Sequence, residues 1–240
     1  MQKQHWRTWL PLVMALAGGA AFTIQAQPAR ESAQRGPGLA QRFPSFSDWH
    51  FRAGLGPEFT DDSAFSLDPT QPDAKVRFDS GLRFDAVGGY QFSPYFSLEC
   101  ATGVIYNRID SIAGSPETDG DFAQIPFLIN AVFQAPTSTG FTPFAGAGFG
   151  FTVDYLNLNQ ATIQGYDITG NADTAAFAYQ VMAGLAYRFA PGMDISVAYE
   201  FLGTTQPEWD VNSASGGPTQ TLDLRRPYTH AVVAAVTIQF

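Results

Sequence analysis

The sequence predicts an all-β fold, an eight-stranded antiparallel up-and-down β-barrel that crosses a membrane. Three observations lead to this prediction: eight segments in which apolar and polar residues alternate, connections that are short and long in turn, and large apolar residues at the segment ends. A side-chain period of two indicates strands. Tight turns at one end and long loops at the other are typical of membrane barrels.

The predicted strands are long for a soluble protein, in which strands average about 5–6 residues. Most of them match the roughly 9–11 residues that a tilted strand needs to cross a bilayer. Their alternation is regular: Ile195 and Val197, for example, flank the polar Ser196. The predicted strands are Trp49–Leu55, Leu82–Phe92, Phe96–Asn107, Phe122–Gln134, Phe141–Val153, Ala175–Phe189, Met193–Leu202 and Tyr228–Phe240.

The connections between these strands alternate in length. Short turns at 93–95, 135–140 and 190–192 separate long loops at 56–81, 108–121, 154–174 and 203–227. In a membrane barrel the short turns face the periplasm and the long loops face outward. Both ends of the barrel domain are therefore expected on the periplasmic side.

Large apolar residues indicate which face of the strands points outward. A soluble sandwich buries its apolar face between two sheets, whereas a membrane barrel turns that face to lipid. Residues at the short-turn ends form the girdle expected at a membrane interface, namely Phe92, Phe96, Phe133, Phe141, Phe189, Met193 and Phe240. We therefore expect the apolar face to meet lipid. A soluble exported sandwich or lipocalin-like carrier is the alternative fold.

The N-terminal residues predict export. Lys3 and Arg7 precede an apolar stretch at 9–24, and Ala26 ends a plausible cleavage site, so we expect a signal peptide over 1–26. Residues 27–47, rich in Pro, Gly, Gln and Arg, are expected to form a flexible periplasmic leader. The barrel domain is then expected over 48–240.

Composition excludes several classes of protein. The formal net charge of -9 argues against a nucleic-acid partner, because a phosphate backbone requires a basic surface. Cys100 is the single cysteine, so no intrachain disulfide forms. After residue 26 no run of about 18 apolar residues occurs, so no transmembrane helix is expected.

Four segments carry a resemblance to a known family: "IPFLINAVF" (Ile125–Phe133), "TPFAGAGFGF" (Thr142–Phe151), "AGLAYRFAPGMDISVAYEF" (Ala183–Phe201) and the terminal "VTIQF". In these segments, and over Trp49–Phe240 as a whole, the chain resembles the outer-membrane β-barrel domain family. That family includes the OmpA-type transmembrane domain and OmpX-like small barrels. The resemblance implies a location in the outer membrane of a Gram-negative-type bacterium, among outer-membrane lipid and lipopolysaccharide.

The last strand stays apolar to its final residue. A closed barrel has no free edge, so this strand is expected to pair with the first one. A C-terminal Phe also resembles the sorting signal that the outer-membrane insertion machinery reads, which implies that machinery as a partner. The residues assigned to the signal are Tyr228, Val236, Ile238 and Phe240.

Charged residues of both signs fall on the face predicted to line the lumen. The interior of an eight-stranded barrel is only wide enough for its side chains to fill it, and buried charges are tolerated when they are paired. We therefore predict an ion-pair network that plugs the lumen. It serves either as a static polar core or as a gate for small ions. Its members are Arg52, Arg83, Asp85, Glu99, Arg188 and Glu200.

The sequence contains no recognisable catalytic, cofactor or metal site. His50 is predicted to face the lumen and His230 the lipid, and neither has an acidic or serine partner at a recognisable spacing. Two distant histidines also make a poor metal site. Gly146, Gly148 and Gly150 lack the spacing of a phosphate-binding loop. We expect them instead to make room for arginine and aromatic side chains opposite.

The four long loops hold 16 of the 22 acidic residues. These acids either bridge through divalent cations to lipopolysaccharide, form a recognition surface, or simply solvate the loops. Apolar residues interrupt them and either pack the loops together or contact a partner that the sequence does not identify. Those residues are Phe59, Phe65, Leu67, Tyr155, Leu156, Leu158, Ile163, Tyr166 and Trp209.

The sequence therefore predicts a small, non-enzymatic integral outer-membrane protein with a structural or surface-interaction role through its acidic external loops. A narrow passive pore for ions or small solutes is the alternative function. A lipid-modifying barrel enzyme is a third reading.

Overall fold

The computed structural model describes residues 48–68, 70–213 and 220–240. These residues all belong to one unit. The expected signal peptide (1–26) and leader (27–47) lie outside the described residues. Across the described ranges, no helix has the length and apolar character needed to span a membrane.

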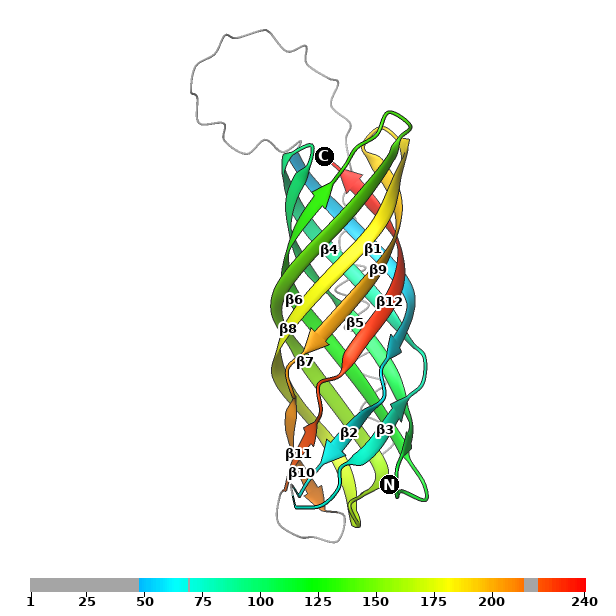
Figure 1. The fold of residues 1–240 in the computed structure, drawn as a ribbon, viewed down its shortest axis with the longest axis vertical. Helices are drawn as coiled ribbons and strands as arrows, with labels where there is room; N and C mark the ends of the chain where they lie inside the picture. Colours follow the sequence, from blue (N-terminus) through cyan, green and yellow to red (C-terminus); the bar gives the residue numbers. More distant parts are fainter. Residues whose placement is uncertain (1–47, 69, 214–219) are drawn as a thin grey trace. The chain divides into compact units, whose positions relative to one another are not determined.

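Twelve strands are present in the described residues and form a single sheet (Figure 1). Neighbouring strands in this sheet run antiparallel. Their bounds are β1 Trp49–Thr60, β2 Ser63–Ser66, β3 Ala74–Phe78, β4 Gly81–Ser93, β5 Phe96–Ile112, β6 Asp119–Gln134, β7 Phe141–Ile163, β8 Tyr166–Ala190, β9 Met193–Thr204, β10 Glu208–Ser213, β11 Gln220–Leu224 and β12 Tyr228–Gln239.

Eight of these strands close into a ring in the order β1, β4, β5, β6, β7, β8, β9, β12. β12 pairs back onto β1, from His50 opposite Gln239 to Thr60 opposite Thr229. The last residue is held as well, because the Phe240 N–H donates to the Trp49 carbonyl over 3.0 Å. The predicted eight-stranded antiparallel barrel is confirmed, including the closing pair.

The outward face of the ring is apolar and the inward face is polar, as expected. Large side chains point outward at the short-turn end, with Phe133 62% exposed. Ring contacts join this girdle across neighbouring strands, for example Phe92 with Phe96 and Phe96 with Phe133. A second girdle lies further along the strands and includes Phe59, Phe127, Phe151, Phe177 and Tyr179. We place the membrane-crossing part between the two girdles.

The segments predicted as long loops are mostly strands. β2, β3, β10 and β11 continue four strands of the ring beyond short breaks, and Figure 1 shows them at the end away from the C-terminus. They join the ends of β5 to β8 that lie away from the short turns, through the pairs β5–β3, β3–β2, β2–β11, β11–β10 and β10–β8. We call this second ring the extension and define it as 61–79, 108–121, 154–174 and 205–226 without the undescribed residues. Pro207 and Pro227 mark two of the breaks, because proline has no N–H to donate.

An apolar core fills the extension. Trp209 is 1% exposed, its ring meets Phe122 edge-on at 6.2 Å, and its Nε1–H donates to the Asp154 carbonyl over 3.1 Å. Of the interrupting apolar residues, Phe59, Tyr155 and Tyr166 are exposed. Most of the others pack the loops together. The core consists of Phe65, Ala74, Val76, Ile109, Ile112, Phe122, Leu156, Leu158, Ala161, Ile163, Ile168, Trp209, Val211, Leu222 and Leu224, with Leu67 packed against it.

Candidate functional site: the polar interior of the barrel

Five of the six charged residues predicted to line the lumen are buried or half-buried in the barrel interior, and Arg188 lies exposed at its rim. Their ion pairs divide them into three groups rather than one continuous network. The central group is Arg83 with Asp85 and Glu200, the group toward the short-turn end is Arg52 with Glu99, and Arg188 forms a pair at the rim.

The central group is built around a fully buried guanidinium. Arg83 on β4 is 1% exposed, and its Nε–H donates to both carboxylate oxygens of Asp85, over 3.0 and 3.1 Å. Its Nη2 lies 2.6 Å from Glu200 Oε2 on β9 and 3.0 Å from Gln180 Oε1 on β8. One arginine therefore compensates two buried carboxylates and ties three strands together across the lumen.

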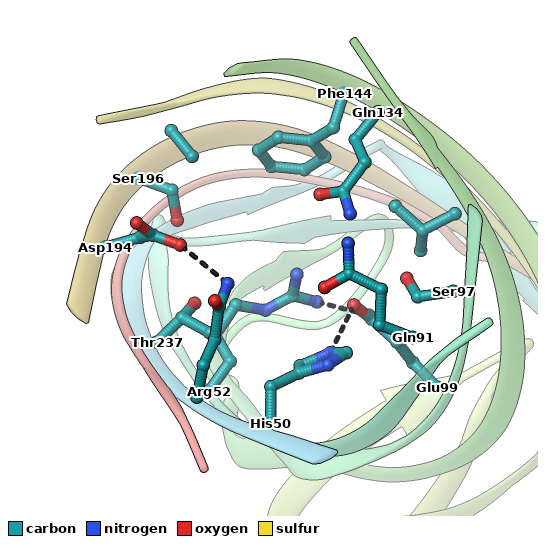
Figure 2. A pocket seen from close by; sticks show the side chains of 13 residues that line it. His50, Arg52, Gln91, Ser97, Glu99, Gln134, Phe144, Asp194, Ser196 and Thr237 are labelled. Atoms are coloured by element: carbon teal, nitrogen blue, oxygen red, sulfur yellow. Dashed lines mark hydrogen bonds and ion pairs between the residues drawn. The ribbon is translucent and has the colours of Figure 1, made fainter. Parts of the chain in front are cut away.

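The second group lines a small polar cavity near the short-turn end (Figure 2). Glu99 on β5 accepts from Arg52 Nη2 over 2.9 Å and lies 3.1 Å from His50 Nε2, and Figure 2 shows both β1 side chains pointing toward it. Asp194 lines the same cavity of about 50 Å³. That volume holds a few water molecules at most.

The rim pair differs in its exposure to solvent. Arg188 donates from Nε and Nη2 to the two oxygens of Asp194, over 2.8 and 3.1 Å, and its side chain is 52% exposed. Gln239 Nε2–H also donates to Asp194, over 3.0 Å. An ion pair this exposed contributes about 1 kcal/mol or less to stability.

Toward the extension, the interior holds carboxylates that the sequence analysis missed. Glu58 accepts hydrogen bonds from Thr60, over 2.7 Å, and from Asn107. Asp154 accepts from Gln124 over 3.0 Å. Both carboxylates are completely buried, and neither forms an ion pair within the described residues. Both residues continue the inward-facing alternation of their strands, but the sequence analysis predicted irregular loops at 56–81 and 154–174 and therefore did not assign them to the lumen.

Asp154 lies in the extension, outside the membrane-crossing part, and its carboxyl is perturbed. Burial raises the pKa of Asp154 from 3.8 to about 6, against the hydrogen bond from Gln124 that lowers it. Asp68, in the exposed β2–β3 connection, behaves oppositely: the hydroxyl and backbone N–H of Thr70 lower its pKa by donating to it.

A pH dependence is expected from Asp154. A carboxyl whose folded-state pKa is raised above its unfolded value holds its proton more tightly in the folded chain, so stability is greatest at low pH and falls as pH rises. The extension is expected to lose about 2 kcal/mol of stability between about pH 4.5 and about pH 7.5. Urea unfolding followed by Trp209 fluorescence measures this.

The variant Asp154→Asn is expected to remove most of that pH dependence. The matched control Asp173→Asn, which changes an exposed carboxylate in the same extension, is expected to retain it. An unchanged pH profile in Asp154→Asn contradicts the assignment.

The structure gives both histidines partners that spacing did not reveal. His50 contacts Glu99, and His230, on the outward face, contacts Tyr199 and Asp61. Among the described residues no group of three potential ligands is placed to hold a metal ion.

The three glycines of β7 face the lumen, as expected, but the space they leave is used differently. A side chain at Gly148 would collide with Asn130 on β6, and one at Gly146 would press on Val132 and Met182. The expected arginine and aromatic side chains are therefore not what fills this space; amide and aliphatic side chains of adjacent strands do.

A closed ring with a lipid-facing girdle at each side and a polar interior defines an outer-membrane β-barrel. Residues 14–240 match the family model described as "Outer membrane protein beta-barrel domain". The chain belongs to this family, which confirms the resemblance found in the sequence. Its surroundings are therefore those of the outer membrane, with lipid against the girdles.

Solved structures show the same fold at low sequence identity. OprG of Pseudomonas aeruginosa is similar with a TM-score of 0.55 and 16% identity, over 81% of this chain and 97% of that one. The protease OmpT of Escherichia coli is similar with a TM-score of 0.52 and 11% identity, over 83% and 99%. Such likenesses show the fold alone. A comparison with curated proteins finds no significant match.

Proposed function

We propose that this protein is a closed, non-enzymatic outer-membrane barrel that anchors its extension at the cell surface in a structural or surface-interaction role. The observation that carries this proposal is the apolar core of the extension, which contains Trp209 and Phe122 and lies beyond the polar groups of the lumen. Ions that entered past Arg52 and Arg83 would meet this core. The extension is ordered by its own packing, as a surface platform requires.

Export and assembly belong to the same proposal. Residues 1–26 serve as the signal peptide, 27–47 as a periplasmic leader, and the C-terminal strand as the sorting signal read by the insertion machinery. Tyr228, Val236, Ile238 and Phe240 all point outward, which supports a signal that a partner reads before the barrel closes. Lipopolysaccharide is the proposed neighbour of the acidic extension.

The alternative function is a narrow pore in which the lumen charges act as a gate. Two barriers weigh against it: Arg83 is bound on both sides, and the extension core lies beyond it. The cavity beside Glu99 is small, about 50 Å³.

Planar-bilayer recording tests the choice. We expect no sustained conductance from the wild-type protein and none from Glu99→Gln, with a porin as positive control and heat-modifiable gel mobility to show that each sample is folded. Steady wild-type conductance would refute the closed barrel. Conductance that appears only in Glu99→Gln would establish the gate instead.

A further inference from the structure

A string of polar side chains lies on the outward, lipid-facing side of the barrel where β12 begins. His230 Nδ1 lies 2.6 Å from Tyr199 Oη, and His230 Nε2 lies 3.4 Å from Asp61 Oδ2. A carboxylate only accepts hydrogen bonds, so His230 Nε2–H donates to Asp61, and the Tyr199 hydroxyl lies within hydrogen-bond distance of Nδ1. The string leads from the lipid-facing surface to the first break in the ring.

Aromatic rings surround this string. The ring of Phe201 lies 5.2 Å from His230, 5.7 Å from Tyr228 and 6.0 Å from Tyr179. A side chain at Gly203 would collide with the Tyr179 ring, so that ring lies directly over the β9 backbone. The result is a broad aromatic surface with polar tips, set at the girdle nearer the extension.

The positively charged residue next to this surface is Arg226. Arg226 is exposed, precedes Pro227 and has a backbone φ of 20°, which L-residues rarely adopt. It lies two residues before Tyr228, at the break that precedes β12. Its neighbour Arg225 is neutralised by Asp73, whereas Arg226 forms no ion pair within the described part of the chain.

We propose that this surface, formed by Tyr179, Phe201, Tyr228, His230 and Arg226 and here named the β12 face, binds the phosphorylated headgroup of a glycolipid in the outer leaflet. A guanidinium binds phosphate bidentately. The tyrosine hydroxyls and the histidine ring nitrogens can form hydrogen bonds with sugar hydroxyls, and the aromatic rings can pack against the adjoining acyl chains.

The depth of the β12 face favours a membrane lipid over free phosphate. Its rings lie in the interfacial girdle, where headgroups meet hydrocarbon, and its cation lies just beyond them. The inference rests on the proposed function only for its orientation, with the extension outside the cell.

The test uses the full-length protein folded into phosphatidylcholine vesicles with or without lipid A. Lipid A is expected to raise the urea midpoint of the wild-type protein, because a ligand that binds only the folded state stabilises it. Arg226→Gln is expected to bind lipid A about tenfold more weakly, through loss of a charge-assisted contact. Arg108→Gln makes the same charge change at an exposed residue of β5 and is the matched control. It is expected to bind lipid A as the wild type does.

Other probes define the ligand. Dephosphorylated lipid A is expected to bind the wild type and Arg226→Gln equally, and inorganic phosphate is expected not to displace lipid A. His230→Gln, checked for folding by gel mobility, is expected to weaken binding as well.

Three results overturn the proposal: wild-type affinity in Arg226→Gln, equal loss in Arg108→Gln, or displacement by inorganic phosphate. Conductance recorded on the same preparations separates the two ideas. If the barrel does not conduct but binds lipid A weakly, only the proposed binding at the β12 face is refuted. If the barrel conducts but binds lipid A as expected, only the proposed closed barrel is refuted.

Discussion

Replacing Arg83 with methionine is expected to cost about 3–5 kcal/mol of stability, because it leaves two buried carboxylates without their cation. Asp85 and Glu200 both depend on this guanidinium, at 3.0 and 2.6 Å. Burial makes the loss large, since water cannot replace the missing partner. Urea unfolding in lipid vesicles, followed by gel mobility, measures the change.

Two companion variants isolate the cause. The triple variant Arg83→Met, Asp85→Asn, Glu200→Gln is expected to recover most of the loss, because no uncompensated charge remains. Arg188→Gln breaks a half-exposed pair at the rim and is expected to cost about 1 kcal/mol or less. If Arg83→Met alone also costs only about 1 kcal/mol of stability or less, water reaches the two carboxylates. The central barrier of the closed lumen is then absent.

The strands of the ring and their two faces were predictable from the sequence because both follow from a local rule. The alternation around Ser196 assigns an inward face to Asp194 and Glu200 whatever their partners are. Closure by β12 was predictable too, because an apolar strand end in a membrane requires a partner.

The partners of the lumen charges were not predictable in the same way. Arg83 and Glu200 are 117 positions apart and lie on β4 and β9, which are not neighbours in the ring. Their contact depends on the stagger of every strand between them, and the sequence does not give that stagger. The contact between His50 and Glu99 was unpredictable for the same reason, although both residues were expected on the lumen face.

The extension was missed because its strands are short and interrupted. Leu156 and Leu158 continue the period of two beyond the membrane-crossing part of β7, but the neighbouring Asn157 and Asn159 are residues typical of loops. Polar composition only correlates with loops. The burial of Leu156 and Leu158 results from packing against strands that are distant in the sequence, which composition does not predict.

Trp209→Ala is expected to cost the extension about 3–5 kcal/mol, since truncating a buried aromatic side chain leaves a cavity. It also removes the Nε1–H that the Asp154 carbonyl accepts and the edge contact with Phe122. The loss is expected to be local, because the ring closes through β12 and β1 without help from β10. Limited proteolysis in vesicles is expected to cut the extension while heat-modifiable mobility is retained.

Tyr166→Ala is the matched control, because it removes an aromatic ring that is 40% exposed at the tip of the same extension. It is expected to leave protease resistance unchanged, and Trp209→Phe is expected to retain most of it. Equal resistance in Trp209→Ala and the wild type would mean that backbone pairing alone orders the extension. The apolar core would then no longer account for the closed lumen, and a conductance recording of Trp209→Ala would show whether Arg83 closes it unaided.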